Sequence, residues 1–163
     1  MKGISFVILI SLLLTLLTSC VKKHDLSQKE IFSIINEIVK DNNLSVHKAC
    51  FSFDPQLRSK AFLYEFSKND KKFILRQIEL FKNLKINQGD LKYYSFFYKK
   101  WFDVKIDTIC KEQTLTVFAL PLISSDRELV ILGYYPPGQG GEYLYKKRNE
   151  HWILVKTFEH WIE

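Results

Sequence analysis

The sequence has little of the residues that mark the most specialised protein classes. Its 163 residues include only three cysteines, six glycines and four prolines. Three cysteines are too few for a miniprotein held by several disulfides or for a four-cysteine zinc site. So little glycine and proline excludes collagen-like and low-complexity chains. Apolar residues make up 47% of the chain, which excludes intrinsic disorder and predicts a compact core.

A nearly unbroken apolar run occupies the amino terminus. Residues 4–17 follow Lys2 and are interrupted only by two serines and one threonine. As a helix this run measures about 21 Å, which is shorter than the ~30 Å hydrocarbon core of a bilayer. A basic start, a short apolar stretch and then small residues are typical of a secretory signal peptide. A permanent membrane-spanning helix is the alternative interpretation.

The run ends in Leu17, Thr18, Ser19 and Cys20. These four residues resemble the lipobox of bacterial lipoproteins, which consists of Leu, a small residue, Gly, Ala or Ser, and then Cys. The resemblance implies that a diacylglycerol is attached to the Cys20 thiol, that the chain is cut before Cys20 and that the new amino terminus is acylated, for example with palmitate. The alternative is an ordinary cleavable signal with a cysteine at its end by chance.

This resemblance predicts the domain organisation and the location. Residues 1–19 are expected to be a signal peptide, residues 20–26 a lipid-anchored tether, and residues 27–163 a single domain held at the membrane of a bacterial cell envelope. The net charge of the whole chain is +6. Because an envelope protein meets glycans, peptides and lipids, this charge does not predict nucleic-acid binding. Lys22 and Lys23 lie where anionic head groups would attract them.

Hydrophobic spacing predicts helices first and strands later. A helix is expected to begin at a capping box of Ser27 and Glu30 and to be stopped by residues 41–43, and a second helix is expected to be capped by Asp70. Neither helix nor strand is favoured for residues 93–102. Strands are expected over residues 46–53, 61–66, 115–120, 128–135, 142–147 and 151–161, with a loop at 136–141 and a tight turn at 148–150.

This order of elements predicts an α+β fold, in which N-terminal helices pack on a mainly antiparallel sheet that ends in a C-terminal meander. Residues 121–161, which include Gly140, Gly141 and Trp152, resemble the C-terminal segment of small uncharacterised bacterial lipoproteins. The same style of hairpin is similar to the cone-shaped domains of the nuclear transport factor family. Both resemblances imply fold and location only, because this fold serves many functions.

Consecutive apolar residues predict that both faces of the sheet are covered. Residues 130–132 and 152–155 are all apolar, whereas a strand with one wet face alternates apolar and polar residues. We expect the pair of N-terminal helices to cover one face. The aromatic segment, sheet curvature or a partner would cover the other.

Residues 92–102 contain seven aromatic residues among eleven. The favoured interpretation is that most of these rings belong to the core. The alternative is a binding surface in which Tyr94, Tyr98 and Trp101, beside lysines, stack on sugar rings or lipid head groups. Gly138 and Gly140 of the 136–141 loop are a second candidate surface.

Cys50 and Cys110 are the two cysteines that remain after lipidation. In an oxidising envelope they can form one disulfide, or they can stay as two buried thiols. No catalytic or metal-binding motif stands out, and neither a metal nor a cofactor is predicted. A cleft in which Asp103, Glu142 and His160 converge would be required for a hydrolase.

The predicted function is therefore a membrane-anchored envelope lipoprotein that acts as a non-enzymatic binding module for a protein, a glycan or a lipid. The sequence leaves two alternatives open. One is a small envelope hydrolase with a carboxylate-lined cleft, and the other is a periplasmic immunity or inhibitor protein.

Overall fold

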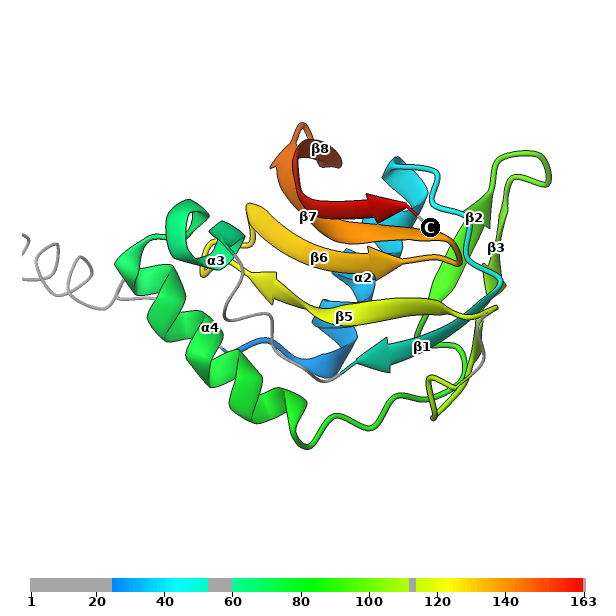
Figure 1. Ribbon diagram of the computed structural model, residues 1–163, viewed down its shortest axis with the longest axis horizontal. Coiled ribbons are helices and arrows are strands. Elements are labelled where there is room, and N and C mark those ends of the chain that lie inside the picture. The colour runs from blue at the N-terminus through cyan, green and yellow to red at the C-terminus, as the bar shows by residue number, and fades with distance from the viewer. Residues whose placement is uncertain (1–24, 53–59, 112–113, 163) are drawn as a thin grey trace, which may run out of the picture.

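A computed structural model describes residues 25–52, 60–111 and 114–162 of the chain (Figure 1). The proposed signal peptide and Cys20 lie outside these residues. The described helices are α2 (Gln28–Asp41), α3 (Lys60–Glu65) and α4 (Lys68–Phe81). The described strands are β1 (Lys48–Ser52), β2 (Lys92–Ser95), β3 (Lys100–Asp103), β4 (Lys105–Ile106), β5 (Thr116–Ile123), β6 (Leu129–Tyr135), β7 (Gln139–Arg148) and β8 (His151–Ile162).

The strands form a large and a small sheet, and the predicted α+β class is confirmed. Six strands lie in the order β4-β1-β5-β6-β7-β8, while β2 and β3 form a separate two-stranded sheet. Strands β5 to β8 are antiparallel neighbours, as expected for the C-terminal meander, whereas β1 runs parallel to both β4 and β5. The turn from β7 to β8 needs only Asn149 and Glu150. Both have positive φ values, 49° and 64°, which suits a two-residue hairpin turn.

The helices cover both faces of the six-stranded sheet, and α4 contributes to the core on each side, with Phe73 and Phe81 in the core of α2 and Ile74 in the other. Successive side chains of a strand point to opposite faces, and β6 places Val130 and Leu132 in one core with α2. Ile131 between them belongs to a second core, which contains Phe62, Phe66 and Ile74 from the α3–α4 region. Helix α2 lies behind the strands in Figure 1. Both faces of β6 are therefore covered. The expectation that the two N-terminal helices cover one face holds only in part, because α4 shares the core of α2 and also packs in the second core.

Strand β8 is not covered on both faces, although its consecutive apolar residues 152–155 predict that it is. Trp152 is buried, but Ile153, Leu154 and Val155 are 43%, 43% and 42% exposed. The physical reason is position in the sheet, because β8 is an edge strand that pairs only with β7.

Several element boundaries also differ from the prediction. Residues 61–66 fall largely in helix α3 and form no strand. Ser67, and not Asp70, is the N-cap of α4, and Asp70 completes the capping box from the third helical position. Strand β5 continues through Pro121, because its pairing with β6 is irregular between Ala119 and Leu122, where the missing proline N–H is tolerated.

Helix α2 begins as expected at Ser27, whose hydroxyl accepts a hydrogen bond from the Glu30 N–H. In the expected capping box the Glu30 carboxylate would accept a hydrogen bond from the Ser27 N–H. In the structure this carboxylate binds Arg127. No helix in the described part of the chain combines the length and apolarity needed to cross a bilayer.

Candidate functional site

The segment that sequence spacing left undetermined is the β2–β3 hairpin, the small sheet at the right of Figure 1. A four-residue loop, residues 96–99, joins its strands. The Tyr98 N–H donates to the Ser95 Oγ at 3.3 Å, and Lys99 takes a positive φ of 52°. The loop is therefore built without glycine or proline, which are the usual sequence signals for a turn.

Aromatic rings pair across the two strands of this hairpin. Tyr94 lies opposite Trp101, and their ring centroids are 5.3 Å apart. Tyr93 lies opposite Phe102 at 5.4 Å. Because neighbouring residues of a strand face opposite ways, the two pairs lie on opposite faces of the hairpin. Aromatic cross-strand pairs of this kind stabilise a sheet, which matters because an isolated hairpin is only marginally stable.

Helix α2 and the chain before β1 hold the hairpin against the domain. The Lys40 Nζ lies 5.4 Å from the Tyr94 ring centroid and 6.0 Å from that of Trp101. On the other face, the Tyr93 ring packs edge-on against His47 at 5.3 Å. Asn36 adds two backbone contacts at the base of β2, since its amide donates to the Asp90 carbonyl and its oxygen accepts from the Lys92 N–H. The hairpin is thus positioned by side chains and does not join the large sheet.

The hairpin exposes its aromatic rings, so the favoured interpretation of a buried aromatic segment is wrong. None of the seven rings of residues 92–102 is fully buried. The most exposed are Phe97 (85%), Tyr98 (64%), Phe96 (55%) and Trp101 (41%). Large exposed apolar groups that gather in one place mark interaction sites. Of the predicted binding residues, Tyr98 and Trp101 are exposed and Tyr94 is half-buried beneath Lys40.

The two glycines proposed for a second surface have different surroundings. Gly138 is exposed and has a φ of +79°, as its place in the turn before β7 requires. Gly140 is buried within β7, and a Cβ at this position would come 2.5 Å from the Tyr135 Cδ1 and 3.1 Å from its Cα. Gly140 is therefore a packing residue and not part of a binding surface. The predicted 136–141 loop is also shorter, because β7 begins at Gln139.

Cys50 and Cys110 are joined by a disulfide with a Cα–Cα distance of 5.5 Å. The bond links β1 to the chain that follows β4, and it closes a loop that contains α3, α4 and the hairpin. Of the two states that the sequence allowed for these cysteines, the structure has the bonded one.

The residues considered for a hydrolase do not form a site in the described part of the chain. Asp103 is exposed on β3, where Lys92 Nζ lies 3.8 Å from its carboxylate. Glu142 is buried in β7 of the other sheet. A carboxylate pair needs a shared cleft, and these two residues lie on different sheets. The His160 side chain lies outside the described part of the structure, although its backbone belongs to β8. No three His, Cys, Asp or Glu side chains among the described residues gather as metal ligands would.

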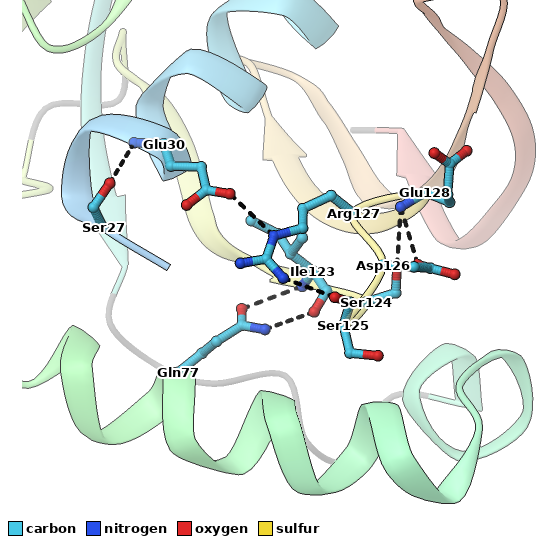
Figure 2. Close-up of polar contacts among 9 residues, drawn as sticks. All are labelled: Ser27, Glu30, Gln77, Ile123, Ser124, Ser125, Asp126, Arg127 and Glu128. Atoms are coloured by element: carbon cyan, nitrogen blue, oxygen red, sulfur yellow. Dashed lines mark hydrogen bonds and ion pairs between the residues drawn. The ribbon is translucent and has the colours of Figure 1, made fainter. Parts of the chain in front are cut away.

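A polar corner where α2, α4 and the β5–β6 turn meet was missed by sequence reasoning (Figure 2). Arg127 in this turn donates from Nε to the Glu30 Oε1 at 3.0 Å and from a guanidinium nitrogen to the Ser125 carbonyl at 2.7 Å. Asp70 of α4 accepts a hydrogen bond from the Ser125 N–H at 2.8 Å. The cluster of serine and aspartate at residues 124–126 is the only sequence signal of this turn.

The polar corner adjoins a surface pocket of about 550 Å³ lined by Asp70, Lys72 and Arg76, among others. Burial pushes the pKa of Asp70 upward, but the hydrogen bonds from Ser67 and Ser125 outweigh it, so that the pKa is lower than usual. Arg76 lies 3.4 Å from the Asp25 carboxylate. Because Asp70, Arg76 and Arg127 each bind groups of the protein, this corner serves to connect elements and is a weaker candidate site than the hairpin.

Gln77 should be the most sensitive residue near this corner. Its buried side chain donates to the Ile123 carbonyl at 2.6 Å and accepts from the Ile123 N–H at 3.3 Å (Figure 2). Gln77→Leu keeps most of the side-chain volume but removes both hydrogen bonds to the Ile123 backbone, so we expect the free energy of unfolding to fall by about 2 kcal/mol. Urea unfolding measures this loss, and the exposed Glu79→Ala variant should stay within about 0.5 kcal/mol of the wild type. A Leu variant as stable as wild type would contradict the assignment.

Comparison with protein-family models, with curated proteins and with solved structures finds no match to this chain. The similarity to the nuclear transport factor family and the two lipoprotein resemblances therefore stay predictions.

Proposed function

We propose that this protein is a lipoprotein of a bacterial cell envelope, anchored to a membrane through acylated Cys20, whose domain is a non-enzymatic binding module. The observation that carries the proposal is the sequence Leu17-Thr18-Ser19-Cys20 at the end of a short apolar run. A diacylglycerol and a further acyl chain give stable anchoring, whereas a single chain gives only marginal binding.

The Cys50–Cys110 disulfide supports the proposed location. Disulfides form and persist in oxidising compartments such as the bacterial periplasm and the cell surface. Both cysteines lie in the domain after the proposed cleavage site, and their pairing leaves Cys20 as the remaining cysteine of the chain. This distribution fits a chain in which two cysteines form the disulfide and Cys20 is the lipidation site.

The β2–β3 hairpin is the proposed binding surface. Its support is the exposure of four rings, Phe96, Phe97, Tyr98 and Trp101, on one protruding element. A rigid aromatic ring offers a large contact area at a small cost in side-chain entropy. The positions of Asp103 and Glu142 on different sheets leave the hydrolase alternative without a supporting observation.

The lipid anchor is tested by Cys20→Ser. We expect this variant to lose all radiolabel from palmitate and to leave the membrane fraction of bacterial cells, because no thiol remains to accept the diacylglycerol. Cys110→Ser is the control, since it also replaces one cysteine by serine. It breaks the disulfide but leaves Cys20 unchanged, so it should keep the label. Equal label and equal membrane association in the Cys20→Ser variant and the wild type would overturn the proposal.

A further inference from the structure

The loop of the hairpin is a protruding aromatic tip. Phe96, Phe97 and Tyr98 are all exposed, and the Phe97 and Tyr98 ring centroids are 4.8 Å apart. In Figure 1 the hairpin extends beyond the six-stranded sheet. Sites for small ligands are concave, whereas a protruding tip of this kind is suited to insert into a soft apolar phase. Trp and Tyr are enriched at the level of the head groups in membranes, and Phe is common on the apolar faces of segments that lie in the membrane interface.

Lysines flank this tip on the hairpin. Residues 92–105 contain Lys92, Lys99, Lys100 and Lys105 against the single acidic residue Asp103, a net charge of 4 − 1 = +3. Lys99 and Lys100 are exposed directly behind the tip, and the Lys100 Nζ lies 4.7 Å from the Phe102 ring centroid. An anionic membrane surface attracts each such lysine by about 1 kcal/mol.

Two lysines of α2 lie beside the hairpin. The three carboxylates of α2 are bound within the protein, Glu30 by Arg127, Glu37 by Trp152, and Asp41 by Trp152 and His151. Lys29, Ser33 and Asn36 of α2 line one shallow hollow together with Lys92, and Lys40, one turn after Asn36, lies over the Tyr94 ring. Residues spaced three or four apart share one side of a helix. The one carboxylate in this hollow, that of Asp90, accepts hydrogen bonds from the Gln28 amide and the Asn87 N–H, which reduces its effect on an approaching anion.

We propose that this surface, formed by the tip (residues 96–98), its flanking lysines and the exposed side of α2, lies on an anionic lipid bilayer. The inference rests on the proposed function, since acylated Cys20 would bring α2 beside a membrane. Helix α2 begins eight residues after Cys20 and is about 21 Å long. With α2 parallel to the membrane plane, the lipid enters the bilayer near its amino-terminal end and the tip enters near its other end.

The test uses a chain of residues 21–163, which lacks both the lipid and the apolar run and so reports the hairpin surface alone. The two described cores begin at Leu26, so this chain keeps them, and a cooperative thermal transition verifies folding. Co-sedimentation is measured with vesicles of phosphatidylcholine containing about one-third phosphatidylglycerol, and with pure phosphatidylcholine. We expect binding to the anionic vesicles that weakens at about 0.5 M salt, and little binding to the neutral ones.

Three variants separate the tip from other exposed apolar residues. Phe97→Ser should weaken vesicle binding about tenfold, because it removes the most exposed ring of the tip. Lys99→Glu with Lys100→Glu should weaken it at least as much and remove the salt dependence. Tyr64→Ser is the matched control, since Tyr64 is an equally exposed aromatic residue (80%) on α3, and it should bind as the wild type does.

Three results would overturn the inference: equal binding by Phe97→Ser and wild type, equal binding to neutral and anionic vesicles, or no sedimentation with either. Hairpin-dependent binding of a soluble protein or a glycan, with no vesicle binding, would also overturn it and identify another occupant. The palmitate label on Cys20 is measured separately. A labelled chain whose hairpin does not bind vesicles overturns this inference alone, whereas an unlabelled chain overturns the proposed function.

Discussion

Removing the Cys50–Cys110 disulfide should lower the free energy of unfolding by about 4 kcal/mol, a large part of the stability of a domain of this size. The two cysteines are 60 residues apart, and the cross-link restricts the unfolded chain over that whole loop. Its loss should lower the melting temperature by on the order of 10 °C.

The measurement is urea unfolding of the wild type with and without reductant, beside a variant that carries Cys50→Ala and Cys110→Ala. We expect the reduced wild type and the double variant to unfold at similar, lower urea concentrations. Reductant should leave the double variant unchanged, which controls for other effects of the reagent. A wild-type protein whose unfolding does not respond to reduction would show that the bond does not stabilise the domain.

Trp152→Ala should be the most damaging substitution of a single side chain, with an expected loss of about 3–5 kcal/mol. Trp152 is 2% exposed and packs from the start of the edge strand β8 onto the end of α2. Its Nε1 donates to the Glu37 Oε2 at 3.1 Å, and its backbone N–H donates to the Asp41 Oδ2 at 2.7 Å. Truncation leaves a cavity where α2 packs on the sheet.

Trp152→Phe is the matched control for this prediction. It keeps most of the ring volume but removes the hydrogen bond to Glu37, so a loss of about 1–2 kcal/mol is expected. Both variants are compared by urea unfolding monitored by far-ultraviolet circular dichroism. Equal losses in the two variants would show that ring volume does not hold α2 on β8.

The long helices could be predicted because their apolar spacing is regular. Ile31, Ile35 and Ile38 of α2 are fully buried, as a helix with one apolar side requires. The short helix α3 was predicted as a strand because a brief apolar run fits either period. Its four-residue spacing of Phe62 and Phe66, which both enter the second core, was the helical signal in this segment.

The candidate site could be predicted only in part. Tyr94, Tyr98 and Trp101 were selected by their residue type, but the exposure of the hairpin was not foreseen. Two features explain this result. Rings occupy both faces of each strand, so no period of two appears, and Lys99 supplies the positive φ of the turn in place of glycine. The position of Lys40 over Tyr94 joins residues far apart in the sequence, and it follows from tertiary packing alone.

Mass spectrometry of the amino-terminal peptide of the protein purified from bacterial membranes shows directly whether Cys20 carries lipid. We expect a peptide that begins at Cys20, with a diacylglyceryl group on the sulfur and a further acyl chain on the amino group. A peptide that begins at Met1, or one that contains Cys20 with an unmodified thiol, would contradict the lipidation of Cys20.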